Sequence, residues 1–277
     1  MKNSTKAVIW GLSAVFIWAA IPAFVKIGST TETLAFLLVC RFLIASLFFL
    51  HNIPGILKKV SEIHPGHWLL LAGILGANYF FQGLAMIELP VSWYLVIFCL
   101  NPILSLVFLG LKLNRKTIFC LLVSVVGTLM FLSWEEISKL PSKTPFIYIT
   151  IGMLTWVAYT VLIKKFQNTY SNIQTTGITQ FVSLFACLGI WLVSGLDVIQ
   201  LNTTQLVSIG ILGVATPLAY FGFNACLRII PRFSIVSQYL EPVFGIFIGF
   251  ILFGESLSTA QLAGAALIVA SMVILEN

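Results

Sequence analysis

Two ionisable side chains, Arg41 and Glu241, lie deep inside apolar stretches of this 277-residue chain. Each is about nine residues from the nearer end of its stretch, which is roughly 13 Å along a helix. A charge at the centre of a bilayer costs about 2.5–3.5 kcal/mol by insertion scales, so each needs a partner or water. Arg41 is therefore a candidate to receive a solute carboxylate, and Glu241 to take an amine or exchange a proton. The alternative is a structural ion pair between the two.

Polar residues repeat at helical spacing in five apolar segments. Because residues four apart share one face of a helix, each stripe turns toward the same neighbours. Five such helices favour a wet central cavity, whereas any single residue also fits an interhelical hydrogen bond worth ~0.6 kcal/mol. The stripes are Asn78 and Gln82; Thr155 and Tyr159; Thr176, Gln180 and Ser183; Thr216, Tyr220 and Asn224; Ser234, Gln238 and Glu241.

Enzymatic chemistry is not indicated. Hydrolysis or group transfer inside a bilayer needs a metal cluster or a nucleophile beside a base. No His lies at membrane depth, since His51, His64 and His67 fall in or beside one connection, and the five Cys show no paired spacing. We therefore expect no enzyme, no metal site and no cofactor.

Ten apolar segments must position these side chains, each long enough to cross a ~30 Å hydrocarbon layer at ~1.5 Å per residue. The chain is 59% hydrophobic and 9% charged, with a mean hydropathy of +1.04, which is outside the range of soluble domains. The predicted fold class is an all-α integral membrane protein with ten transmembrane helices. The segments are residues 7–26, 32–50, 67–87, 91–111, 116–133, 146–163, 173–195, 204–226, 233–253 and 259–275.

Basic residues mark one side of these segments. Most fall before the first segment or after an even-numbered one, whereas Lys139 and Lys143 go against this rule. Since basic loops stay in the cytoplasm, the pattern predicts that both termini are cytoplasmic. The net charge of +6 then reflects orientation in a lipid bilayer and not nucleic-acid binding. The residues that follow the rule are Lys2, Lys6, Lys58, Lys59, Lys112, Arg115, Lys116, Lys164, Lys165, Arg228 and Arg232.

The two halves of the chain echo each other. With five segments in each half, the second half must run opposite to the first, which is an inverted-topology repeat. We expect repeats at 1–133 and 145–277, joined by an outer loop at 134–144, with a site between them. The matching features are Trp18 and Lys26 with Trp156 and Lys164, residues 73–76 with 210–213, and Asn101-Pro102 with Glu241-Pro242.

This arrangement resembles the EamA branch of the drug/metabolite transporter (DMT) superfamily. The resemblance rests on the two five-segment halves, on Arg41, and on the run Pro242, Gly254-Glu255, Leu257, Gln261 and Gly264. The first half departs from it, because Leu111 and Lys112 stand where Gly-Glu is expected, and Ser271 replaces a late Gly. The resemblance implies a bacterial inner-membrane carrier for amino acids or related metabolites. It also implies that segments one to four and six to nine surround the cavity.

We therefore predict a secondary transporter that exports carboxylate-bearing solutes by alternating access. The alternatives are a multidrug or cation exporter coupled to protons through Glu241, and a non-transporting receptor of the same fold. Segments 116–133 and 259–275 are almost wholly apolar with small residues, which favours lipid contact or a homodimer interface. The residues expected to contact the solute are Arg41, Glu241, Gln238, Trp18, Trp156, Tyr159, Asn78, Gln82, Gln180, Tyr220, Asn224 and Asn101.

Overall fold

The computed structural model describes residues 3–55, 64–132, 142–195, 201–253 and 258–276, and every regular element among them is helical. Five helices are long and apolar enough to cross a membrane: α1 (Asn3–Gly28), α4 (Pro65–Glu88), α9 (Thr144–Phe166), α10 (Asn172–Val193) and α11 (Thr203–Ile229). Some residues named in the sequence analysis lie outside the described part of the chain. They are Lys2, Lys58, Lys59, Gly254, Glu255, Leu257 and residues 134–141, which include Lys139.

The remaining helices are shorter. The second predicted segment forms α2 (Leu34–Leu47) and a 3-10 turn, η1 (Leu50–Asn52). The fifth and tenth form α7 (Arg115–Leu129) and α14 (Thr259–Glu276). The fourth and ninth are built from α5 (Val91–Phe98) with α6 (Asn101–Phe108), and from α12 (Pro231–Val236), η2 (Ser237–Tyr239) and α13 (Leu240–Phe253).

The segments predicted at 91–111 and 233–253 are thus not continuous helices. In the first, α5 ends at Phe98 and α6 begins three residues later, at Asn101, with Pro102 in its first turn. In the second, a 3-10 turn precedes Pro242. A proline lacks the N–H that continues the helix ladder and disfavours helical geometry in the residue before it. Both breaks therefore fall directly before the paired Asn-Pro and Glu-Pro motifs.

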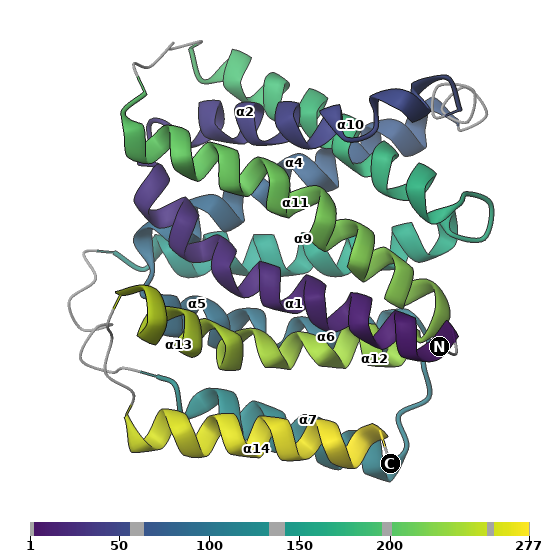
Figure 1. Cartoon of the computed structure of the whole chain (residues 1–277), viewed down its shortest axis with the longest axis vertical. Helices are drawn as coiled ribbons and strands as arrows, with labels where there is room; N and C mark the ends of the chain where they lie inside the picture. The colour runs from purple at the N-terminus through teal and green to yellow at the C-terminus, as the bar shows by residue number, and fades with distance from the viewer. Residues whose placement is uncertain (1–2, 56–63, 133–141, 196–200, 254–257, 277) are drawn as a thin grey trace.

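The helices of one half pack on those of the other in matched pairs (Figure 1). Helix α1 packs along α11, and its counterpart α9 packs along α4. Likewise, α2 contacts α10, and α1 contacts α13 as α9 contacts α6. Each of these contacts between the halves is therefore repeated by the equivalent helices when the two halves are exchanged.

Helices α7 and α14 pack on each other at one edge of the molecule (Figure 1). The hydroxyls of Ser124 and Ser271 lie 2.6 Å apart. A Cβ added to Gly127 would lie 2.7 Å from the Gly264 carbonyl oxygen, so only glycine allows this close approach. The small residues that favoured a subunit contact are therefore used within the chain.

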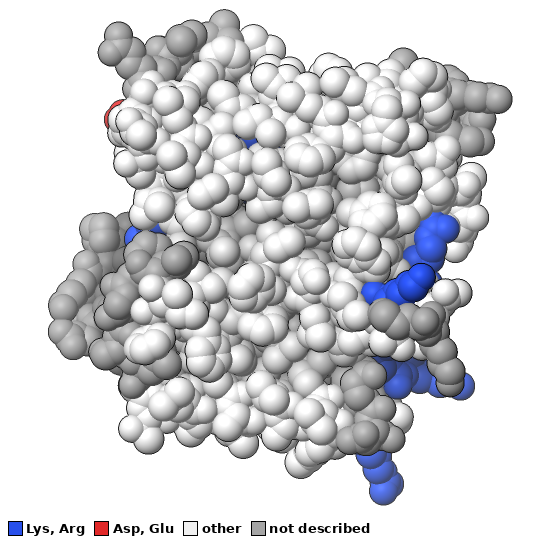
Figure 2. All heavy atoms as spheres, viewed as in Figure 1, with Lys and Arg blue, Asp and Glu red and all other residues white. Residues whose placement is uncertain are grey.

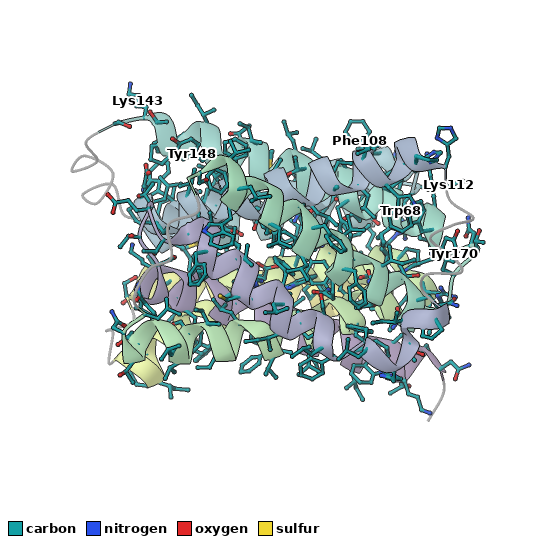
Figure 3. The ribbon with its side chains drawn as sticks, turned by 90° about the horizontal axis from the view of Figure 1, so that it is seen from above. Trp68, Phe108, Lys112, Lys143, Tyr148 and Tyr170 are labelled. Carbon is teal, nitrogen blue, oxygen red and sulfur yellow. The ribbon has the colours of Figure 1, made fainter. Side chains whose placement is uncertain are left out.

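The bundle has two distinct ends. Both termini lie at one of them, where Lys and Arg also gather on the visible face (Figures 1 and 2). Figure 3 places Trp68, Lys112 and Tyr170 at one end, and Lys143 and Tyr148 at the other. We call the end with both termini the terminus end. The opposite end, where α1 and α4 finish, is called the far end.

Candidate functional site

A cavity lies between α1, α2, α4, α5, α9, α11 and α13, and it joins residues from both halves of the chain. It holds about 590 Å³ of unfilled space, including the part that opens to the outside. Apolar and aromatic side chains form most of its wall, as is usual for small-molecule sites. The lining residues are Trp18, Ile21, Pro22, Val25, Leu38, Arg41, Asn78, Tyr79, Gln82, Gly83, Met86, Tyr94, Phe98, Trp156, Tyr220 and Glu241.

Arg41, near the middle of α2, is 5% exposed and lines this cavity. Its Nε donates to the Thr216 hydroxyl at 2.6 Å, and its Cζ lies 5.4 Å and 5.7 Å from the ring centroids of Phe42 and Tyr79. These contacts fix the plane of the guanidinium and add cation–π attraction. The Nη groups have no hydrogen-bond partner among the described residues, which leaves the planar fork available to a carboxylate.

Glu241 lines the same cavity from the first turn of α13, directly after the helix break. It is 8% exposed. Its carboxyl has no hydrogen bond to a described residue, and no ion pair within 4.0 Å joins it to Arg41. The two charges thus share one cavity without neutralising each other in this conformation. A bound solute that carries both a carboxylate and an ammonium could supply the missing partner of each.

Aromatic side chains pack against one another along the cavity wall. The rings of Trp18 and Trp156 meet edge to face at 5.0 Å between centroids, and Trp18 also meets Tyr220 at 5.8 Å. Tyr94 donates from its hydroxyl to Gln82 Oε1 at 2.8 Å. Trp18, Trp156, Tyr220 and Gln82, four of the residues expected to contact the solute, line the cavity.

Two lining tyrosines, Tyr79 and Tyr94, are absent from the predicted set of solute contacts. Tyr79 had a usable signal, because it lies three residues before Gln82 and so on the same face of α4. Tyr94 follows the start of an apolar run without a polar residue at helical spacing, so no comparable signal marks it. Asn78 also lines the cavity, but its amide donates to the Gly152 carbonyl at 2.8 Å and so joins α4 to α9.

Gln238 connects the two broken segments. Its Oε1 accepts from Asn101 Nδ2 and from Trp156 Nε1, both at 2.9 Å. Asn101 and Gln238 line a smaller pocket of about 220 Å³ that Glu241 also borders, and they do not line the main cavity. Gln238 therefore anchors the Trp156 indole by a hydrogen bond and joins it to Asn101 of the other broken segment.

Three further predicted contacts, Tyr159, Gln180 and Asn224, are fully buried outside the cavity. Asn224 donates to Thr176 at 3.1 Å and accepts from the Tyr159 hydroxyl at 3.4 Å. The amide of Gln180 has no partner in the described part of the chain. These three expected solute contacts lie outside the cavity in this conformation, because they face neighbouring helices that pack directly against them.

Metal-binding groups are not assembled in the parts of the chain that the structure describes. No cluster of three or more His, Cys, Asp or Glu is found there, and the five cysteines are free thiols. The described chemistry of the cavity is that of one guanidinium, one carboxyl, two amides and aromatic rings.

Comparison with known proteins agrees with this architecture. A solved crystal structure of a protein superimposes with a TM-score of 0.78, covering 98% of this chain and 96% of that chain at 18% sequence identity, which indicates a shared fold. No curated protein gives a significant sequence match. The EamA-like transporter family matches twice, over residues 5–133 and 143–276. The two matches cover nearly the whole chain, which therefore belongs to the EamA-like transporter family, a family of multi-pass membrane transporters.

Proposed function

We propose that this chain exports amino acids or related carboxylate-bearing metabolites across the bacterial inner membrane as a secondary carrier with alternating access. The observation that carries the proposal is the presence of Arg41 and Glu241 in one buried cavity without an ion pair between them. A buried charge without a partner is unfavourable, so a ligand that neutralises both would be bound strongly.

The guanidinium indicates the first part of the solute. Arg offers planar, paired donors that match a carboxylate, and Thr216 already holds its Nε in place. Glu241 accepts an ammonium group or a proton. The aromatic rings around both charges suit an apolar solute body and add cation–π attraction for an ammonium. An amino acid contains all three features.

The membrane arrangement that we propose is ten spans with both termini cytoplasmic. Its repeats are residues 1–133 and 145–277, joined by the loop at 134–144. Three observations support this arrangement: the two family matches, the matched packing of helices between the halves, and the basic residues at the terminus end (Figure 2). A homodimer through α7 and α14 would have to use their outer, lipid-facing surfaces, because their small residues face each other.

A second candidate is a proton-coupled exporter of organic cations. Glu241 favours it, because this carboxyl has no hydrogen bond to a described residue and lies beside aromatic rings, which is how proteins bind quaternary and protonated amines. The charge of Arg41 in the same cavity disfavours it, because a buried cation repels a second one. The remaining alternative is a receptor of the same fold. It would bind the solute at the same site but would not transport it.

Thermal denaturation of the purified protein with small ligands tests the proposal. A matched series consists of an amino acid, the amine left after removal of its carboxylate, and the acid that lacks its amine. Binding stabilises the folded state by RT ln(1 + [L]/Kd), so the melting temperature reports affinity. We expect the largest shift with some member of the amino-acid panel and a smaller one with its amine. Shifts with organic cations alone would favour the second candidate.

A further inference from the structure

A layer of three hydrogen-bonded side chains, Tyr159, Thr176 and Asn224, lies on the terminus side of the cavity. They come from α9, α10 and α11, and each is fully buried. Asn224 donates to Thr176 Oγ1 at 3.1 Å and accepts from the Tyr159 hydroxyl at 3.4 Å. Its backbone carbonyl also accepts from Gln167 Nε2 at 2.7 Å. We call the three side chains the polar layer, and it ties three helices of the second half together.

The first half has three residues at the same helical positions. Ile21 lies three residues after Trp18 and five before Lys26, as Tyr159 does relative to Trp156 and Lys164. Leu38 is the fifth residue of α2, as Thr176 is the fifth of α10. The third pair is Met86 and Asn224, whose positions follow from a contact that the two halves share.

That contact is made by a lysine at the end of the first helix of each half. Lys26 Nζ donates to the Leu89 carbonyl at 3.3 Å, and Lys164 Nζ donates to the Leu227 carbonyl at 2.9 Å. Each lysine thereby caps the carboxyl end of a neighbouring helix, where a positive charge is favourable. Met86 lies three residues before the capped Leu89 carbonyl, and Asn224 lies three residues before the Leu227 carbonyl, the nearer of the two that Lys164 caps. This places the pair within one residue of the register given by residues 73–76 and 210–213.

Ile21, Leu38 and Met86 all line the cavity on its far side. We call them the apolar layer. The two layers occupy equivalent positions on the two sides of Arg41 and Glu241, but their chemistry differs. The polar layer is held by hydrogen bonds, which water can replace when the layer opens. The apolar layer has only dispersion and exclusion of water to hold it closed.

We propose that the apolar layer is the gate at the far end of the cavity, and that it closes when the polar layer opens. The inference rests on the proposed carrier function, because the two halves of an alternating-access carrier exchange conformations around a central site. The residues of the second half that close the terminus side then predict which residues of the first half close the far side. The two gates differ in kind: one separates by exchanging hydrogen bonds with water, and the other by exposing apolar side chains.

Disulfide cross-linking in the full-length protein tests this without any substrate. The pair Ile21→Cys with Met86→Cys reports closure of the apolar layer. The polar layer is weakened by Thr176→Val, which removes the acceptor of Asn224, or more strongly by Asn224→Leu. The matched control is Thr175→Val, because the only described partner of the Thr175 hydroxyl is the Ser171 carbonyl, at the start of its own helix.

The expected result is that Thr176→Val speeds oxidation of the Ile21→Cys/Met86→Cys pair about fivefold, the effect of one lost hydrogen bond on an opening equilibrium. Thr175→Val should leave the rate within about twofold, and variants that carry only one of the two new cysteines, beside the five native ones, should form no cross-link. A second pair, Ser124→Cys with Ser271→Cys, should react at the same rate in every background, since these side chains already touch.

The proposal is overturned if the gate pair never cross-links while the Ser124/Ser271 pair does. It is equally overturned if neither Thr176→Val nor the stronger Asn224→Leu changes its rate. Thr176→Val keeps the shape of the side chain, so it remains a test even where Asn224→Leu fails to fold. Because cross-linking is measured without solute, its failure is distinct from a failure to transport.

Discussion

Replacement of Arg41 by Gln is the most informative change in the cavity. Arg41 is buried, its Nε is held by Thr216, and its Nη groups have no partner among the described residues. Glutamine keeps a donor that can reach Thr216 but removes the charge and the paired donors. We therefore expect a folded protein that has lost its affinity for solutes carrying a carboxylate.

The size of the loss follows from the bonds removed. A hydrogen bond to a charged group contributes about 1.5–3 kcal/mol, and a carboxylate takes two from the guanidinium fork. A glutamine amide restores part of this, so we expect a net loss of about 3 kcal/mol, or roughly a hundredfold in Kd. Arg41→Lys keeps the charge without the fork and should fall between the two.

The assay is ligand-dependent thermal stabilisation with the solute that gives the largest shift in the unmodified protein. Arg232→Gln is the matched control, because Arg232 lies at the terminus end and bonds to the Lys112 carbonyl outside the cavity. Equal affinity in Arg41→Gln and the unmodified protein would refute the carboxylate role. If Arg41→Gln and Arg41→Lys both fail to fold, the residue serves structure and not recognition.

Three more predictions follow from the same geometry. Glu241→Gln, which resembles the protonated acid, should still bind solute in the thermal assay but lose the response of flux to a pH gradient; an unchanged pH response would exclude a proton role. In thiol labelling, Asn78→Cys should react with impermeant reagents, whereas Asn224→Cys should react only when the terminus side opens, so equal reactivity in all conditions contradicts gating. Gly127→Ala should destabilise the protein by about 1–3 kcal/mol, whereas Gly73→Ala, with no atom within 4 Å of an added Cβ, should not; similar unfolding midpoints would contradict the packing of α7 on α14.

Much of the helical framework was predictable because hydrophobic length and helical spacing are local properties. The apolar runs locate α1, α4, α9, α10 and α11, and the depth of a charge within a run singles out Arg41 and Glu241. That both line one cavity without pairing could not be derived in the same way, since it depends on how the helices between α2 and α13 pack around it.

The parts that the sequence did not predict depend on contacts between helices. A polar stripe identifies a face of a helix but not what covers it, so Gln180 and Asn224 looked the same as Gln82 before their neighbours were known. The helix breaks before Pro102 and Pro242 were marked by proline, yet Pro22 and Pro217 lie within unbroken helices. Whether a proline breaks a helix is decided by the packing around it.

Solute counterflow in proteoliposomes tests the central claim most directly. Vesicles preloaded with unlabelled solute should accumulate labelled solute through the protein, saturably, and vesicles with Arg41→Gln should accumulate only the amount found without protein. Such a result requires a site that faces each side in turn. Binding in the thermal assay without counterflow in the unmodified protein would contradict the account and identify a receptor in place of a carrier.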